Sequence, residues 1–197
     1  SLHDALPISS RLTDRLSDVS RTFDKAILSG YHTDILREQF SASPQIHYLV
    51  QAASDNSPGA HVLYDEELLP IRENSIDLFI SNFSLHWIND LPGALIQIQR
   101  ALKPDGLFLA VLPGPRTLQE LRASFEQAML EIEGGIRPVV SPFVEVRDAG
   151  NLLQRAGFAL PVTDTEGLTL SYDNPFDLMK EFRHMGEGNA LMARRRS

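Results

Sequence analysis

Apolar positions along the chain follow two spacings, one typical of buried strands and the other of amphipathic helices. Nearly continuous apolar runs predict strands at residues 25–28, 46–50, 61–64, 76–81 and 107–112. Between and after these runs, apolar residues recur every three or four positions, which predicts helices. The helices are expected over residues 12–23, 33–43, 90–102, 117–134 and 174–185, with another ending near residue 156.

Polar and glycine residues mark where these helices begin and end. N-terminal caps are expected at Thr33, Asp90, Thr117 and Asn174. Thr117 and Glu120 have the spacing of a capping box. A turn is expected at residues 103–106, with Gly106 permitting a positive φ. Glycines should end two helices, at Gly134-Gly135 and at Gly157.

Strands that alternate with helices through short links predict a doubly wound, mostly parallel α/β sheet. Alternating apolar residues at 168, 170 and 172 predict one further strand. We expect a single domain over residues 9–197. Residues 1–8 do not continue the pattern and are expected to be a non-native or disordered leader.

Charge and composition narrow the classes of partner. The chain has 197 residues, no cysteine and a formal net charge of −8. An acidic surface repels phosphate backbones and anionic lipids, so we expect no nucleic-acid partner. The longest apolar run, 107–112, is too short for an integral membrane segment. The absence of cysteine excludes disulfides and fits a reducing compartment, such as the cytoplasm.

Ligands of open α/β sheets bind beyond the carboxyl ends of the strands. This rule selects residues 29–32, 51–54, 65–66 and 81–87 as candidate site segments. The histidines show no metal-ligand spacing, so no metal site is expected.

Residues 62–110 (VLYDEELLPIRENSIDLFISNFSLHWINDLPGALIQIQRALKPDGLFLA) resemble the second half of class I S-adenosylmethionine-dependent methyltransferases. Within that family the chain is similar to the malonyl-carrier-protein O-methyltransferase of biotin synthesis. It is more similar to the methyltransferase-like assembly factor of respiratory complex I, which residues 118–172 and 178–191 also resemble. The resemblance covers roughly residues 12–192 and implies a Rossmann-like methyltransferase sheet.

The resemblance implies roles for residues at the strand ends. Asp65 matches the acidic position whose carboxylate accepts a hydrogen bond from the adenine amino group, and Glu66 adjoins it. Gly30 matches the glycine-rich first loop, which approaches the methionine and ribose. Gln51 stands near the position where the family has a carboxylate for the ribose hydroxyls. An amide lacks the charge that strengthens such hydrogen bonds.

The loop after the fourth strand carries the other implied site residues. Asn82, Phe83 and His86 match the loop beside the sulfonium and the substrate pocket. A histidine's ordinary pKa of about 6.5 suits a general base, so His86 is the candidate catalytic residue. The alternative is that His86 serves only as a polar residue at a helix entry.

Two departures from the family pattern affect the expected function. The first loop has one glycine instead of several, and the family's final helix and strand have no counterpart before residue 197. We therefore expect a C-terminally truncated domain that lacks its last strand.

Three functions remain open on the sequence. The first is a methyltransferase with S-adenosylmethionine as cofactor, related to complex I assembly. The second is a protein-arginine hydroxylase acting on a complex I subunit, in the mitochondrial matrix or at the inner-membrane periphery. The third is a non-catalytic protein-binding module with a degenerate cofactor site.

Overall fold

The computed structural model describes residues 11–31, 33–53, 59–135 and 143–184. The chain forms two compact units: the first comprises Ser1–Leu112 and Val146–Leu168, and the second Pro113–Glu145 and Thr169–Ser197. The expected leader at residues 1–8 lies outside the described residues. The expected single domain over residues 9–197 stays a prediction.

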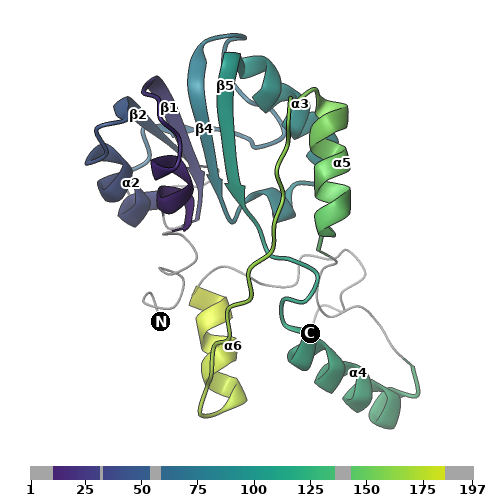
Figure 1. Ribbon diagram of the computed structural model, residues 1–197. Coiled ribbons are helices and arrows are strands. Elements are labelled where there is room, and N and C mark those ends of the chain that lie inside the picture. The colour runs from purple at the N-terminus through teal and green to yellow at the C-terminus, as the bar shows by residue number, and fades with distance from the viewer. Residues whose placement is uncertain (1–10, 32, 54–58, 136–142, 185–197) are drawn as a thin grey trace. The chain divides into compact units, whose positions relative to one another are not determined.

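Unit 1 is built on a sheet of five parallel strands (Figure 1). The strands are β1 (Phe23–Gly30), β2 (Ile46–Ala53), β3 (Val62–Leu63), β4 (Ile76–Asn82) and β5 (Leu102–Val111). Their order is β3-β2-β1-β4-β5, so the direction of the strand order reverses between β1 and β4. This arrangement confirms the predicted doubly wound parallel sheet, with β3 and β5 as the edges of its described part.

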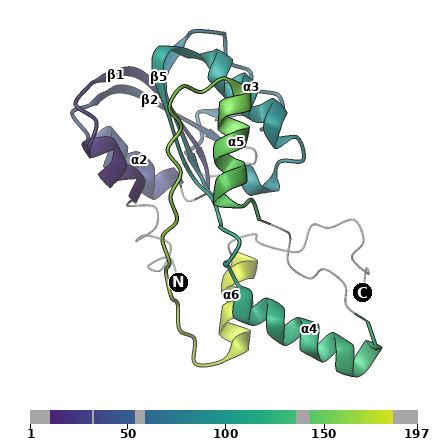
Figure 2. The ribbon, with the colours of Figure 1, turned by 45° about the vertical axis from the view of Figure 1, so that its right-hand side comes forward.

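Helices cover both faces of this sheet, as Figure 2 shows. The helix over residues 11–17 and α2 (Thr33–Ser41) lie on one face, where Leu16, Phe40 and Leu78 belong to one buried cluster. On the other face lie α3 (Leu91–Ala101) and α5 (Val146–Ala156), with Phe79 and Ile98 in a second cluster. Burial on both faces explains why β4 reads as a nearly continuous apolar run.

Several helix ends follow the predicted chemistry. The Asp90 carboxylate caps α3 by accepting a hydrogen bond from the Gly93 N–H at 2.9 Å. Gly157 ends α5 with φ +96°, and the Phe158 N–H donates to the Leu153 carbonyl oxygen as in a Schellman motif. In unit 2, the Asn174 side chain accepts from two backbone N–H groups at the start of α6 (Pro175–His184).

The predicted helix over 12–23 is too long, because it ends at residue 17 and Phe23 opens β1. The Gln45 side-chain amide donates to the carbonyl oxygens of Leu16, Val19 and Arg21. These bonds satisfy carbonyls that a continuing helix would otherwise pair. The spacing that placed Phe23 on a helical stripe is therefore coincidental.

The predicted turn at residues 103–106 lies inside β5 as an irregularity of the ladder. Ile76 pairs with Leu102 but Leu78 pairs with Leu107, so β5 carries extra residues at this point. The positive φ falls on Asp105 (62°), not on Gly106. Gly106 is needed for a different reason, since a Cβ there would lie 2.8 Å from the Lys103 carbonyl oxygen.

Two predictions for the second half of the chain are wrong. The helix α4 (Gln119–Glu133) has no capping box, because its N-cap is Leu118 at φ 60° with no side-chain hydrogen bond. Gly134 does end that helix, at φ 68°. The expected strand at 168–172 is absent from the described residues. Alternation alone does not make a strand, because the backbone also needs a ladder partner.

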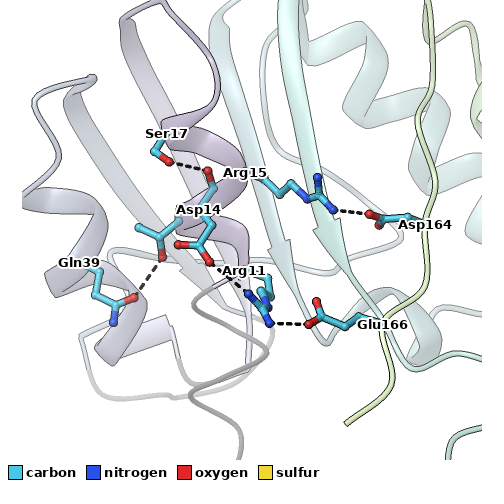
Figure 3. A network of polar contacts seen from close by, with 8 residues as sticks. Arg11, Asp14, Arg15, Ser17, Gln39, Asp164 and Glu166 are labelled. Carbon is cyan, nitrogen blue, oxygen red and sulfur yellow. Dashed lines mark hydrogen bonds and ion pairs between the residues drawn. The ribbon is translucent and has the colours of Figure 1, made fainter.

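Two ion pairs connect the first helix to the segment that follows α5 (Figure 3). Arg11 pairs with Glu166 and Arg15 with Asp164, and all four side chains are more than half exposed. Exposed pairs of this kind contribute less than about 1 kcal/mol each. They orient the segment, whereas apolar burial stabilises the sheet.

A more buried ion pair lies near the amino end of β4. The Asp77 side chain is 13% exposed and accepts from Lys103 Nζ at 2.9 and 3.0 Å. It also accepts from the Lys25 N–H at 3.0 Å. Burial raises the pKa of Asp77, but these bonds and the charges of Lys103 and Arg21 outweigh it and hold the pKa below its ordinary value.

We predict that Asp77→Asn lowers the free energy of unfolding at pH 7 by about 1–2 kcal/mol. The folded-state pKa of Asp77 lies below the value of about 3.9 for an unfolded aspartate. The stabilisation is therefore fully present above that value and is lost as the pH falls through the folded-state pKa. Urea unfolding of both proteins measures it, with Asp105→Asn as control. Equal stability at pH 7 would contradict the prediction.

Candidate functional site

The buried polar side chains of the described residues gather at one edge of the sheet. They lie at or just beyond the carboxyl ends of β1, β2 and β4 (Figure 1). They are Ser29, Thr33, Gln51, Ser81, Asn82 and Ser84. Buried polar groups cost free energy unless they are paired, so their concentration at the ligand edge of a doubly wound sheet marks a candidate site.

The centre of this edge is the contact between Gly30 and Asn82, at the point where the strand order reverses. The two residues are register partners in β1 and β4. Gly30 has φ +110°, and a Cβ there would lie 2.0 Å from the Asn82 carbonyl oxygen. The Tyr31 N–H donates to that oxygen at 2.7 Å, and the Asn82 side-chain amide donates back to the Tyr31 carbonyl at 2.7 Å. Only glycine fits this approach.

The chain leaves β4 through a strained residue and a short 3₁₀ helix, η1 (Leu85–Trp87). Phe83 has φ 49°, and its N–H donates to the Val111 carbonyl oxygen at 2.9 Å. Non-glycine residues in this region are uncommon and cluster at functional sites. The rings of His86 and Trp87 lie 5.2 Å apart, centroid to centroid.

Gln51 is fully buried in β2, the neighbour of β1. Its amide nitrogen donates to Thr33 Oγ1 at 2.6 Å, while Oε1 has no hydrogen-bond partner among the described residues. Gly59 lies on the side of Oε1, since a Cβ built at Gly59 would be 3.4 Å from that oxygen.

Beyond β3 the surface forms an open cleft of about 520 Å³. Its lining residues are Leu63, Tyr64, Asp65, Glu66, Glu67, Trp87 and Ile88. This lining contains three acidic and two aromatic residues and includes no lysine or arginine. Such a cleft offers hydrogen-bond acceptors and an apolar surface, and both suit a flat, amino-bearing ring.

A set of hydrogen bonds that no sequence pattern predicted holds the acidic turn in place. Glu67 Oε1 accepts from the Asn89 N–H at 2.8 Å and from Asn89 Nδ2 at 3.0 Å. Gln97 of α3 donates to the Glu67 carbonyl oxygen at 2.8 Å and accepts from the Leu69 N–H at 2.9 Å. No local signal marks these partners, because they are far apart in the chain.

Tyr64 connects the cleft to the buried polar residues of the sheet. Its hydroxyl shares a hydrogen bond of 2.5 Å with Ser29 Oγ, next to Gly30 in β1. Burial raises the pKa of Tyr64 above its ordinary value. The hydrogen bond with Ser29 lowers the pKa by a smaller amount, and the charge of Glu66 raises it slightly. The hydroxyl therefore stays neutral.

The structure brings the predicted site residues together in two groups. Asp65 and Glu66 line the cleft, whereas Gly30, Asn82 and Phe83 form the strand-reversal point. Gln51 lies buried in β2, where it pairs with Leu28 of β1, and His86 adjoins the cleft residue Trp87. The assignment of these residues to a cofactor or a reaction stays a prediction.

Two further properties concern the part of the chain that the structure describes. No three histidine, aspartate or glutamate side chains there converge as metal ligands would. No helix among the described residues is long and apolar enough to cross a membrane.

A doubly wound parallel sheet of this strand order defines a Rossmann-like α/β class of protein. A solved S-adenosylmethionine-dependent methyltransferase from Thermotoga maritima, titled a possible histamine N-methyltransferase, has this fold. Its TM-score is 0.55 at 14% identity, with 77% of this chain and 71% of that chain covered. Residues 26–110 match the family described as Methyltransferase domain.

Curated relatives identify the family. Putative methyltransferase RP459 of Rickettsia prowazekii is 36% identical over 166 residues, which cover 82% of this chain and 73% of the relative. The chain therefore belongs to the methyltransferase family.

It is also similar to mitochondrial arginine-hydroxylase NDUFAF5 of Danio rerio, at 40% identity over 197 residues, which cover 95% of this chain. The chain spans 61% of the length of that relative. A malonyl-[acyl-carrier protein] O-methyltransferase of Methylovorus is 42% identical over 135 residues, which cover 68% of this chain and 44% of the relative. These matches confirm the resemblance found in the sequence.

We predict that Gly30→Ala destabilises the protein by more than about 2 kcal/mol, because the new methyl group would overlap the Asn82 carbonyl at a positive φ. Thermal unfolding measures the change. Gly167→Ala is the control, since a Cβ there meets nothing within 4 Å. A Gly30→Ala protein as stable as the control would refute the steric account.

Proposed function

We propose that the chain is the S-adenosylmethionine-binding domain of a methyltransferase-like protein that takes part in respiratory complex I assembly. The observation that carries the proposal is the presence of two features at the carboxyl ends of the strands. One is a cleft lined by carboxylates, and the other is the close approach of Gly30 to Asn82, which only glycine permits. The family relationship supports it, as does the resemblance to the complex I assembly factor.

The residues fit the cofactor in three places. The Asp65 carboxylate lies in the cleft and would accept a hydrogen bond from the adenine amino group, with Glu66 beside it. Gln51 Oε1 is a buried acceptor without a partner among the described residues, suited to a ribose hydroxyl. The methionine part would lie beside Gly30, whose missing side chain leaves room for the Asn82 carbonyl.

The remaining proposed roles concern the loop after β4. Asn82 would hold the segments that leave β1 and β4 together through its hydrogen bonds with Tyr31. Phe83, with its positive φ, would direct the chain toward η1. His86 is the candidate base that would take a proton from a nucleophile, if that nucleophile must lose one. S-adenosylmethionine supplies an activated methyl group, so the protein contributes mainly positioning and the exclusion of water.

A second candidate is hydroxylation of a protein arginine. It is favoured by the relatives named arginine-hydroxylase, which are 40–41% identical over 95% of the chain. The word "mitochondrial" in their names favours the mitochondrial matrix as the compartment. The bacterial cytoplasm is the alternative, since relatives also come from bacteria.

A third candidate is a binding module without catalysis. Gln51 in place of a carboxylate and a single glycine in the first loop favour weak cofactor binding. In this case the fold would serve to present a surface to a protein partner.

We predict that S-adenosylmethionine binds the chain with a measurable heat in calorimetric titration, and that Asp65→Asn weakens this binding by about tenfold. The loss of one charge-assisted hydrogen bond gives this magnitude. Asp105→Asn is the matched control, because Asp105 lies at the turn inside β5 and its left-handed backbone suits asparagine. No heat and no thermal shift at millimolar ligand would reject the cofactor and favour the binding module.

We further predict that loss of the protein in a deletion strain removes a methyl group from one complex I subunit, detected by mass spectrometry of the purified subunits. Loss of a single oxygen atom from an arginine would instead establish hydroxylation. Unchanged subunit masses together with failed assembly would leave the non-catalytic role as the answer. Re-expression of the intact protein is the control.

A further inference from the structure

Glu67 connects the two walls of the cleft. It lies on the turn after β3, where its neighbours Asp65 and Glu66 line one wall. Its carboxylate accepts two hydrogen bonds from Asn89, at 2.8 Å from the backbone N–H and 3.0 Å from Nδ2. Asn89 follows Trp87 and Ile88, which line the other wall. The Glu67 side chain thus links the turn after β3 to the segment after β4, and these two strands are not neighbours in the sheet.

The backbone of Glu67 also fixes the direction of Asp65. The Glu67 N–H donates to Asp65 Oδ1 at 2.9 Å, so one carboxylate oxygen of Asp65 is held by the turn. The Glu67 carbonyl accepts from Gln97 Nε2 at 2.8 Å. Gln97 belongs to α3, which is anchored on the sheet by the buried Ile98. The turn is thereby attached to a rigid helix.

We propose that Glu67 is the positioning residue of the cleft, holding Asp65 and the Trp87 wall in place for the ring of the ligand, a role that rests on the function proposed above. Glu67 itself turns its carboxylate toward Asn89. It acts through Asp65 and Trp87 and is not a catalytic residue.

The charge of Glu67 matters to this role. An ionised carboxylate accepts stronger hydrogen bonds than an amide oxygen of the same shape. The backbone N–H of Asn89, followed by its side chain, holds the pKa of Glu67 below its ordinary value. Glu67→Gln preserves the size of the side chain but weakens both bonds to Asn89.

Trp87 provides a direct readout of the wall. It is the single tryptophan of the chain and is 37% exposed, two positions before Asn89. Its fluorescence therefore reports whether the wall is held, with or without a ligand in the cleft.

The experiment compares Glu67→Gln, Asn89→Ala and the double variant with the wild-type chain. Calorimetry gives the dissociation constant for S-adenosylmethionine, acrylamide quenching of Trp87 is measured without ligand, and thermal unfolding gives stability. We expect each single variant to bind about five- to tenfold more weakly and to be quenched more strongly. The double variant should lose less affinity than the sum of the two single losses, because both changes act on the bond from Asn89 Nδ2, whereas the bond from the Asn89 backbone N–H survives Asn89→Ala.

Glu73→Gln is the matched control, since Glu73 is exposed and lies outside the cleft lining. Its dissociation constant for S-adenosylmethionine and the acrylamide quenching of its Trp87 should equal those of the wild type. The proposal is overturned if Glu67→Gln and Asn89→Ala match Glu73→Gln in both affinity and quenching. It is also overturned if they only lower the unfolding temperature while the folded variants bind normally.

Failure of the proposed function is distinguishable from failure of this role. A wild-type chain that does not bind S-adenosylmethionine would reject the proposed cofactor. The quenching of Trp87 in the ligand-free proteins would still decide whether Glu67 holds the wall.

Discussion

The close approach of Gly30 to the Asn82 carbonyl oxygen is the contact on which the candidate site depends. It occurs where the strand order reverses, so the segments that leave β1 and β4 diverge from a common point. A side chain at Gly30 would force β1 and β4 apart. The bonds between Tyr31 and Asn82 then fix the two departing segments, and the positive φ of Phe83 directs the second toward η1. The Ser29 hydroxyl, next to Gly30, connects this point to the cleft through its hydrogen bond with Tyr64.

The site has a rigid floor and a turn held by side chains. The floor consists of buried polar residues in strands that are covered by helices on both faces. The acidic turn after β3 has little ladder of its own, because β3 is only two residues long. Its position relies on Glu67, Asn89 and Gln97. Packed strands thus carry the floor, and hydrogen bonds to Glu67 hold the acidic turn.

The sequence predicted the parts of this structure that local pattern determines. The buried strand β4 and the position of Asp65 at the end of β3 followed from an apolar run and a strand boundary. The first helix was overextended, since its end depends on Gln45, and the turn in β5 was misread because its ladder partner is distant. Glu67 could not be predicted, because Asn89 lies 22 residues further along the chain. Contacts between distant segments leave no periodic signal.

The most direct test of the account is a crystal structure of the chain grown with millimolar S-adenosylhomocysteine, the demethylated product of the cofactor. The account predicts the adenine ring in the cleft, with its amino group within hydrogen-bond distance of the Asp65 carboxylate, and the amino-acid part next to Gly30. A ligand bound elsewhere, or a cleft that stays empty at that concentration, would contradict it.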